Sequence, residues 1–323
     1  MSPADAGWRP TATMGALRLR ATLLARVRDH FAASGALEVE TPTLVRAAVT
    51  DVHLESLEVR HADGTVAGYL HTSPEYAMKR LLCAGAPDVY QVTRVFRDGE
   101  RGRNHNPEFT MVEWYRLGID HHALMRDVEV LVRAMLAGCR DVAPSQTWTY
   151  AQAFERALGV DVLQCRPGDL VAALVRHGVD VPAALGEDRD GLADLAMSIV
   201  VAPSFPADRL TFVHDFPASQ AALARIRGPV ASRFEAFWGG IELANGFHEL
   251  GDADEQALRF QQDSALRRER GQRSHEPDGR FLAALEAGLP ECSGVALGFD
   301  RVVMVAARAG RIDEVVAFTT ENA

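Results

Sequence analysis

Cysteine is scarce in this chain and is never clustered. The 323 residues contain four cysteines, and no two of them form a CxxC pair. They are Cys83, Cys139, Cys165 and Cys292. Disulfide frameworks and thiolate zinc sites both depend on closely spaced cysteines. The sequence therefore predicts neither of them, and this spacing favours a protein of the reducing cytoplasm.

Long apolar runs and an excess of basic charge are missing as well. No segment approaches the roughly 18–20 apolar residues that a membrane span requires, and residues 1–20 lack the apolar core and cleavage site of a secretory signal. With 34 basic and 44 acidic residues, the formal net charge is −10. Non-specific binding to nucleic acid relies on basic surface. We therefore expect neither a membrane nor DNA as a partner.

The patterns of apolar and turn-forming residues predict one α+β domain, residues 1–323, with an antiparallel sheet and a mainly helical insertion at about 145–232. Helices are expected from Leu17 to Gly35, from Ser73 to Gly85, and over roughly 254–271. In the second of these, Ser73 is the expected N-cap and Pro74 lies in the first turn. Strands or hairpins are expected at residues 36–40, 54–71, 89–96, 109–115, 211–216, 234–250 and 293–297.

The most polar loop lies within FRDGERGRNHNPEFTMVEWY, residues 96–115, and joins two apolar strands. Its three arginines, Arg97 among them, offer forked donors that suit phosphate better than lysine does, and Asn106-Pro107 marks the turn back toward the sheet. On the returning strand, the two-residue period places Glu113 and Tyr115 on one face. Glu113 is an acid among apolar and aromatic residues. It either lies at a sheet edge without a function or binds a cationic ligand, and we favour the second interpretation.

Residues 234–250 predict a hairpin with a two-residue turn. Such a turn sets Glu235 opposite Ala244 and makes Glu235 and Glu242 diagonal neighbours on one face, ~7–8 Å apart at the backbone. Glutamates in this arrangement converge on a hard cation such as Mg²⁺. The alternative is a half-buried hairpin with both glutamates on its solvent side, which the same alternation also produces.

A third candidate is GVALGFDRVVM, residues 294–304, where a strand ends at Gly298 and Arg301 sits in the first turn of a helix. The start of a helix favours anions, and an arginine there can bind phosphate through two donors. The alternative is an ordinary strand-to-helix turn with a surface arginine.

Two further features are set aside. His121-His122 has no recognisable set of ligands near it in the sequence and is interpreted as the junction of a loop with a helix. Phe237-Trp238 is assigned to the core rather than to a stacking platform.

Together these segments resemble the catalytic domain of class II aminoacyl-tRNA synthetases, specifically the lysyl type. LEVETPTL (37–44), VTRVFRDGERGRNHNPEFTMVEWY (92–115) and GVALGFDRVVM match the three motifs of that family in order, and TSPEYAMKRLL (72–82) and FEAFWGGIELANGFHEL (234–250) are lysyl-like too. The resemblance covers the chain from about residue 15 onward. It implies an enzyme that uses ATP and Mg²⁺ to form an aminoacyl-adenylate, and a homodimer joined through the first motif.

The first motif begins at residue 37, which leaves no room before it for the anticodon-binding domain of lysyl-tRNA synthetases. The chain is therefore more similar to the elongation factor P–lysine ligases, which lack that domain and join (R)-β-lysine to a lysine side chain of elongation factor P. The runs TSPEY, HNPEFTMVEWYR, FPASQAALA and CSGVALGFDR are shared with them. This resemblance implies (R)-β-lysine or lysine as substrate, elongation factor P as protein partner, and no tRNA.

The resemblance also implies roles for single residues. Arg97 and Arg301 would be catalytic and hold the phosphates of ATP, and Glu235 and Glu242 would bind Mg²⁺. Glu242 would also belong to the ATP site. The other residues of that site would be Asp98, Gly99, Glu100, His105, Asn106, Phe109, Leu243 and Gly298. The amino-acid pocket would consist of Ser73, Pro74, Glu75, Glu113, Tyr115, Asn245, Glu249 and Ala296. Several carboxylates suit a substrate with two ammonium groups.

Two positions depart from the pattern of tRNA synthetases. Many class II enzymes have Arg-x-Glu in the second motif, whereas this chain has Glu100 one place later, so either Glu100 replaces that glutamate or the backbone at Gly99 suffices. Lysyl-tRNA synthetases usually have glycine at the place of Ala296. The extra methyl group would press against the α-substituent of lysine, which fits the selection of a β-amino acid.

Two other functions are compatible with the same motifs. The first is a truncated lysyl-tRNA synthetase, or an enzyme that makes free lysyl-adenylate. The second is a catalytically inactive relative that binds an amino acid or a protein. Inactive relatives typically lose the arginines or the metal-binding carboxylates, and this chain retains all of them.

Overall fold

The structure is a computed structural model that describes residues 8–323. Residues 1–7, part of the stretch tested for a secretory signal, lie outside the described residues. Within residues 8–323, nine strands form one large sheet in the order β1-β5-β6-β12-β11-β10-β8-β7, with β9 paired to β10. The pairs are antiparallel except for β1·β5 and β7·β8, the outermost pairs of that order. The predicted α+β class and antiparallel sheet are therefore confirmed.

The strands of the large sheet largely follow the predicted ranges. They are β1 (Leu37–Glu38), β5 (Val89–Phe96), β6 (Glu108–Leu117), β7 (Gln146–Thr149), β8 (Leu210–Pro217), β9 (Ile226–Arg227), β10 (Val230–Trp238), β11 (Ile241–His248) and β12 (Cys292–Gly298). The short strands β7 and β9 were not predicted, and β8 joins the main sheet although it falls inside the predicted insertion.

The hairpin β10–β11 turns where predicted, but its register differs from the predicted one. Glu235 pairs with Asn245 and not with Ala244, because Leu243 is an extra residue that forms a β-bulge. The predicted partner of Glu235 was therefore wrong by one residue. The bulge still leaves Glu235 and Glu242 on the wall of one cavity.

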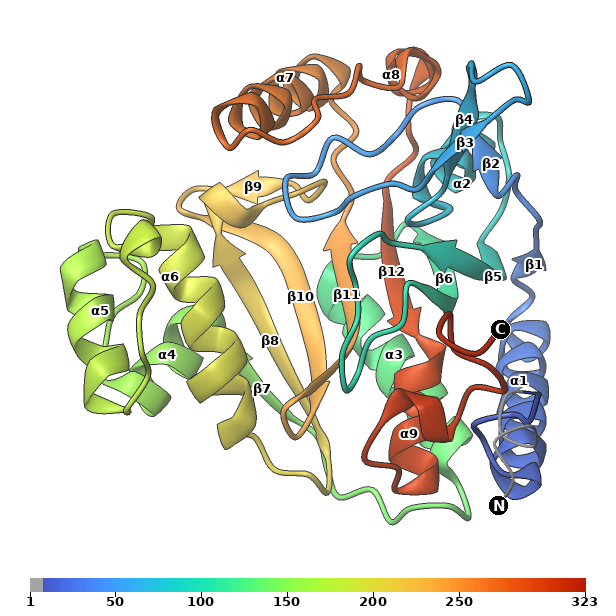
Figure 1. Ribbon diagram of the computed structural model, residues 1–323, viewed down its shortest axis with the longest axis horizontal. Coiled ribbons are helices and arrows are strands. Elements are labelled where there is room, and N and C mark those ends of the chain that lie inside the picture. Colours follow the sequence, from blue (N-terminus) through green and yellow to red (C-terminus); the bar gives the residue numbers. More distant parts are fainter. Residues whose placement is uncertain (1–7) are drawn as a thin grey trace.

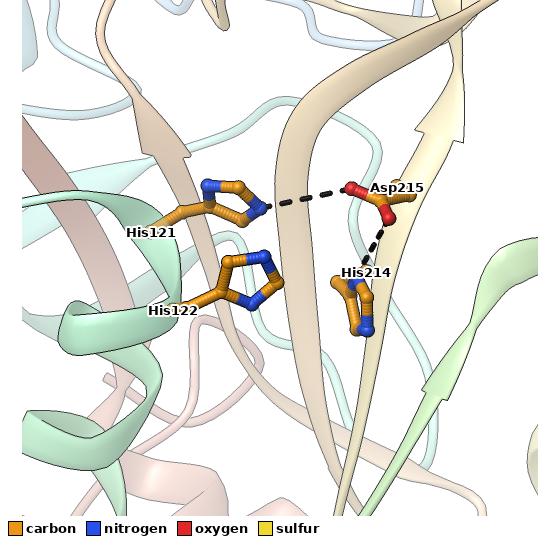
Figure 2. Close-up of side chains that lie close together, drawn as sticks. All are labelled: His121, His122, His214 and Asp215. Atoms are coloured by element: carbon orange, nitrogen blue, oxygen red, sulfur yellow. Dashed lines mark ion pairs between the residues drawn. The ribbon is translucent and has the colours of Figure 1, made fainter.

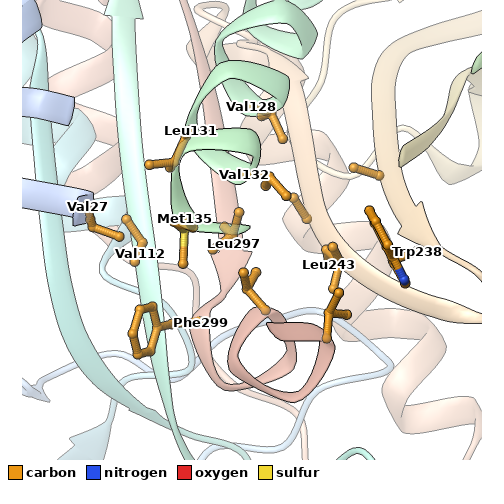
Figure 3. Packing of buried hydrophobic residues seen from close by; sticks show 14 of the residues in the cluster. Val27, Val112, Val128, Leu131, Val132, Met135, Trp238, Leu243, Leu297 and Phe299 are labelled. Carbon is orange, nitrogen blue, oxygen red and sulfur yellow. The ribbon is translucent and has the colours of Figure 1, made fainter. Parts of the chain in front are cut away.

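The main core lies between the large sheet and the helices α1 (Met14–Ser34), α3 (His121–Leu136) and α9 (Phe299–Ala307). These three helices lie on the same side of the sheet in Figure 1. In Figure 3, Val27, Leu131 and Phe299 of the helices meet Val112 and Leu297 of the strands. Burying an aliphatic or aromatic side chain of this size contributes ~1.5–3 kcal/mol, so this cluster fixes the three helices against the sheet.

A second core belongs to the helical region that the sequence predicted as an insertion. It contains α4 (Tyr150–Leu158), α5 (Pro167–Arg176), α6 (Arg189–Ala196) and a π-helical turn at Met197–Val201, and it packs against Phe216 and Phe237 of the sheet. Figure 1 shows these helices beyond β7 and β8. Phe237 and Trp238 are both buried, as predicted. The organisation as a single domain with an insertion stays a prediction.

A third group of elements lies beyond one end of the central strands (Figure 1). It comprises α2 (Glu75–Cys83), α7 (Ala253–Glu269), α8 (Gly279–Ala287), and a small sheet of β2 (Leu44–Val45), β4 (Val66–Leu70) and β3 (Glu58–Arg60). Helix α8 was not predicted. The N-cap of α2 is Pro74 rather than Ser73. The Ser73 hydroxyl still accepts from the Glu75 amide at 3.0 Å, and it donates to Glu113.

One buried contact joins the first helix to the segment that carries Arg301. Asp300 is 1% exposed and forms an ion pair with Arg20 of α1, while its second oxygen accepts a hydrogen bond from the Thr110 amide of β6 at 2.8 Å. The start of α9 is thereby fixed to β6. Among residues 8–323, none of the helices has the length and apolar character needed to cross a membrane.

Candidate active site

A cavity of about 1810 Å³ lies on the face of the large sheet opposite to α3 and α9. Side chains on β6 and β12 alternate between the two faces. Met111 and Ala296 line the cavity, whereas Val112 and Leu297 belong to the core. This alternation follows from the two-residue period of a strand, and it explains how one sheet supports both the core and a polar site.

Most residues that were expected to bind ATP or the amino acid line this cavity. They are Ser73, Pro74, Glu75, Arg97, Glu100, His105, Asn106, Phe109, Glu235, Glu242, Leu243, Asn245, Ala296, Gly298 and Arg301. Glu113, Tyr115 and Glu249 are buried next to it. Asp98 and Gly99 do not line it, contrary to expectation, because the Asp98 carboxylate turns back onto the Gly99 amide at 2.8 Å. A role for these two in binding ATP stays a prediction.

Arg97 is fixed at the wall of the cavity by three contacts. Its Nε donates to the carbonyl oxygen of Thr72 at 3.3 Å, its Nη1 donates to Glu100 Oε1 at 3.3 Å, and its guanidinium lies 5.1 Å from the centre of the Phe109 ring. Gly99 has φ = 76°, a conformation that glycine adopts without strain, and this turn brings Glu100 back to Arg97. The loop path therefore brings Glu100 into contact with Arg97, and its replacement of the usual glutamate stays a prediction.

Arg301, in the first turn of α9, contacts the returning half of the polar loop. Its Nη1 donates to the carbonyl oxygen of Glu242 at 2.9 Å, and its Nη2 lies 2.8 Å from His105 Nε2. Burial, followed by the charge of Arg301, lowers the pKa of His105. A neutral imidazole can accept the hydrogen bond from Arg301, so these residues hold one another in place without a charge conflict.

The side chain of Asn106 is occupied by contacts within the protein. Its Nδ2 donates to the carbonyl oxygen of Glu108 at 2.7 Å, and its Oδ1 accepts from the Thr320 amide at 3.3 Å. Asn106 thus closes the polar loop and binds the C-terminal segment. It also lines the cavity, and its expected role in binding ATP stays a prediction.

Glu235 and Glu242 are the best candidates for a metal site in the cavity. Glu235 is only 9% exposed. The alternative in which both glutamates lie on the solvent side of the hairpin is therefore wrong for Glu235. Burial first, and then the charge of Glu242, raise the pKa of Glu235 to about 7, while Arg233 Nη2 donates to its Oε1 at 2.6 Å. Carboxylate oxygens are the ligands that Mg²⁺ prefers, and a divalent cation would relieve the repulsion between the two glutamates. The donor set therefore fits Mg²⁺.

The pocket for the amino acid is rich in carboxylates. Glu113 accepts hydrogen bonds from the hydroxyls of Ser73 and Tyr115, both at 2.7 Å. Its pKa is raised to about 7 by burial and then by the charge of Glu75. Glu249 is 1% exposed; its Oε2 contacts the buried ammonium of Lys79, and its Oε1 has no hydrogen-bond partner. A pocket of this kind favours a ligand that brings positive charge.

Lys79 is a residue of this pocket that the sequence argument missed. It is fully buried, and its Nζ lies 2.6 Å from Glu75 Oε1 and 2.5 Å from Glu249 Oε2. Burial, opposed by the Lys79 ammonium, raises the pKa of Glu249 above its usual value. The spacing of Glu75 and Lys79, four residues apart on one helix, was the signal that could have revealed this pair.

Ala296 stands in the middle of the pocket floor. In the sheet it pairs with Asn245 on one side and with Glu113 on the other, so its methyl group lies between two residues that were expected to bind the amino acid. Two residues earlier, Gly294 lies beneath Tyr115 and Glu249, and a Cβ atom at Gly294 would collide with both. The floor at Gly294 therefore permits no side chain, and Ala296 carries the smallest one.

The sequence matches the family described as tRNA synthetases class II (D, K and N) over residues 7–322. Among curated proteins, it is 47% identical over 319 residues to a protein of Vibrio parahaemolyticus, covering 96% of this chain and 97% of that protein. It is 48% identical over 326 residues to a protein of Klebsiella pneumoniae, covering 98% and 99%. Both relatives are named elongation factor P–(R)-β-lysine ligase. The chain belongs to the class II tRNA synthetase family and, within it, to the family of these ligases.

Proposed function

We propose that the chain activates (R)-β-lysine with ATP and transfers the β-lysyl group to the ε-amine of a lysine on elongation factor P, in the cytoplasm. The observation that carries this proposal is the presence of both kinds of charged side chain at one cavity. Arg97 and Arg301 line the cavity, and the acids Glu113 and Glu249 are buried beside it, so one site offers both cationic and anionic side chains. The ammonium groups of a diamino acid complement the acids, and the phosphates of a nucleoside triphosphate complement the arginines.

In the first step, a carboxylate oxygen of the amino acid attacks the α-phosphate of ATP, forms an O–P bond and displaces pyrophosphate. Arg97 would bind the α-phosphate and the attacking carboxylate, and Arg301 would bind the γ-phosphate. The carboxylate is already ionised, so no general base is required, and the residues act by positioning and by charge neutralisation. Mg²⁺ bound by Glu235 and Glu242 would supply further neutralisation of the phosphates.

In the second step, the ε-amine of the acceptor lysine attacks the carbonyl carbon of the adenylate, an amide bond forms, and AMP leaves. The attacking amine must first lose a proton. Glu113, Tyr115 and Glu249 would meanwhile hold the ammonium groups of the β-lysyl moiety by charge-assisted hydrogen bonds. The substrate is thus held at both ends while its carboxyl group reacts.

The selection of β-lysine over α-lysine is assigned to Ala296. Its methyl group lies between Asn245 and Glu113 on the pocket floor. An α-amino group bound over this floor would press against the methyl group, whereas a β-amino acid moves its amino group one carbon away. A single methyl contact of this kind is worth ~1–3 kcal/mol of discrimination.

We further propose that the enzyme acts as a homodimer joined through residues 37–44, without tRNA. Two large apolar side chains of that segment, Leu37 and Leu44, are 50% and 47% exposed. Contact with a second chain at this segment would remove the apolar surface of both leucines from water. The acidic net charge of −10 agrees with a protein rather than a nucleic acid as the acceptor.

Acceptor specificity tests the proposal. Purified enzyme receives ATP, Mg²⁺ and labelled (R)-β-lysine with either elongation factor P or bulk tRNA, and the label in each acceptor is counted. We expect the protein to be labelled and tRNA to stay unlabelled, with Glu113→Gln inactive. Glu108→Gln is the matched control, because Glu108 lies on the same strand but pairs with Arg94 at 3.6 Å outside the cavity.

The opposite results each identify a competing function. Efficient labelling of tRNA with no label on elongation factor P would make the chain a truncated lysyl-tRNA synthetase. Absence of any amino-acid-dependent exchange of pyrophosphate into ATP would make it an inactive binding protein.

A further inference from the structure

Three histidines and an aspartate meet outside the cavity, at the junction of α3 with β8. His121 and His122 are the first two residues of α3, and His214 and Asp215 lie near the end of β8. One potential ligand atom from each residue lies within 4.8 Å of those of the other three. Figure 2 shows the four side chains turned toward one another across the helix–strand junction. His121-His122 lies at the junction of a loop with α3, as predicted, and the side chains that join it come from a segment distant in the sequence.

The backbone of β8 departs from regular geometry at this point. Successive side chains of a strand normally point to opposite faces, which would separate His214 from Asp215. Asp215 instead has φ = 57°, and the pairing with β10 is irregular between Ala231 and Phe234. As a result, Asp215 Oδ2 lies 3.0 Å from His214 Nδ1 and Oδ1 lies 3.7 Å from His121 Nε2. A residue held in the left-handed region is a reason to look for a function.

Three histidine nitrogens in this cluster are buried without a hydrogen bond. His121 is 3% exposed, and neither its Nδ1 nor its Nε2 has a hydrogen-bond partner. His214 Nδ1 also lacks a partner in hydrogen-bond geometry, although it is close to Asp215. Most buried polar side-chain atoms in proteins are hydrogen-bonded. Unsatisfied imidazole nitrogens that converge with a carboxylate have the composition of a metal-ligand set.

We propose that His121, His122, His214 and Asp215 bind one Zn²⁺ ion. Imidazole nitrogen and carboxylate oxygen are ordinary ligands of zinc, in tetrahedral geometry at ~2.0–2.2 Å. Ligand atoms around such an ion are ~3.4 Å apart, so modest rotations of these side chains would bring them into place. Four protein ligands fill the tetrahedral coordination and leave no open position for a substrate, so the site is structural. The ion would hold the start of α3 against β8.

Another histidine lies close to the cluster: the ring centre of His248 is 6.4 Å from that of His121. His248 is excluded from the set because its Nε2 contacts Glu291 Oε1 at 2.5 Å.

Metal binding is measured on tag-free protein without ATP. Zinc affinity is determined by competition with a chromophoric chelator, and Co²⁺ is used as a spectroscopic probe because tetrahedral N/O ligation gives visible absorption bands. We expect one Zn²⁺ per chain with a Kd below about 1 μM. His122→Gln and Asp215→Asn should each weaken binding at least tenfold and abolish the cobalt bands, and zinc should raise the Tm of the wild type but not of these two variants.

Two controls separate this site from others. His177→Gln removes an exposed histidine at the end of α5, and Glu242→Gln alters the expected Mg²⁺ site; both should keep the tight zinc site. His122 is exposed, so its replacement leaves folding intact, and circular dichroism of the metal-free proteins checks this. Wild-type protein without tight zinc or without tetrahedral cobalt bands would overturn the proposal. Unchanged affinity in Asp215→Asn and His122→Gln would overturn it as well.

Discussion

Ala296 pairs directly with Glu113 where β12 meets β6, so the methyl group that narrows the pocket floor stands beside the buried carboxylate expected to bind the substrate. This pair links the choice of substrate to the charge of the pocket. In the proposed function, the methyl group would limit where an amino group can lie, and the carboxylate would supply the attraction that holds it.

Replacing Ala296 by glycine should shift the preference toward α-lysine. Removing the methyl group opens space over the floor for an α-amino group, so kcat/KM for α-lysine relative to (R)-β-lysine should rise about tenfold or more, equivalent to ~1.4 kcal/mol. Pyrophosphate exchange with each isomer measures the ratio. Ala236→Gly, on the core face of β10, is the control and should lower stability without altering the ratio. An unchanged preference in Ala296→Gly would contradict the assignment.

Replacing Glu100 by glutamine should impair the activation of the amino acid. Glu100 contacts Arg97 Nη1 at 3.3 Å, and its charge keeps the guanidinium directed at the cavity. Without that charge we expect kcat/KM for ATP in pyrophosphate exchange to fall about tenfold, the cost of ~1.4 kcal/mol in one charged contact. Glu108→Gln is again the control. Wild-type kinetics in Glu100→Gln would mean that the Gly99 backbone is sufficient.

The affinity for the diamino acid should increase as the pH rises from about 6 to about 8. The pKa of Glu113 is raised to about 7 by burial and by Glu75, and Glu249 is shifted in the same direction. Below these values the carboxyl groups are protonated, and each must release a proton before it can pair with an ammonium group. Calorimetry in buffers of different ionisation enthalpy measures this proton release. Binding that is independent of pH between 6 and 8 would show that the acids are already ionised.

Replacing Lys79 by methionine should destabilise the protein through the charges that it leaves behind. Lys79 lies between Glu75 and Glu249, and removing one partner of a buried ion pair costs ~3–5 kcal/mol. Adding Glu249→Gln to this variant removes part of the uncompensated charge and should recover part of the loss. Chemical denaturation of the single and double variants gives the coupling free energy. A double variant less stable than the Lys79 single variant would contradict this account.

The hairpin of residues 89–115 could be predicted from the sequence because its strands are rich in β-branched and aromatic residues and its turn residues are strong. The two-residue period of a strand placed Glu113 and Tyr115 on one face, which the hydrogen bond between them confirms at 2.7 Å. The bulge at Leu243 could not be predicted, since nothing local distinguishes an extra residue in an apolar strand. The four residues of β7 are too few to show a period.

Contacts between distant segments were the other limit of the sequence argument. His121 and Asp215 are 94 positions apart in the chain, and only the packing of α3 against the sheet brings them together. Lys79 reaches Glu249 in the same way. Pairings of this kind depend on tertiary structure. The motif residues, in contrast, could be named from their resemblance to a family, and most of them line one cavity.

The mass of intact elongation factor P after incubation with the enzyme, ATP and Mg²⁺ tests the central claim most directly. With (R)-β-lysine, we expect an increase equal to one lysyl residue on a single lysine side chain, and a much slower increase with α-lysine. An unmodified factor, under conditions in which the enzyme forms the β-lysyl-adenylate, would contradict the account.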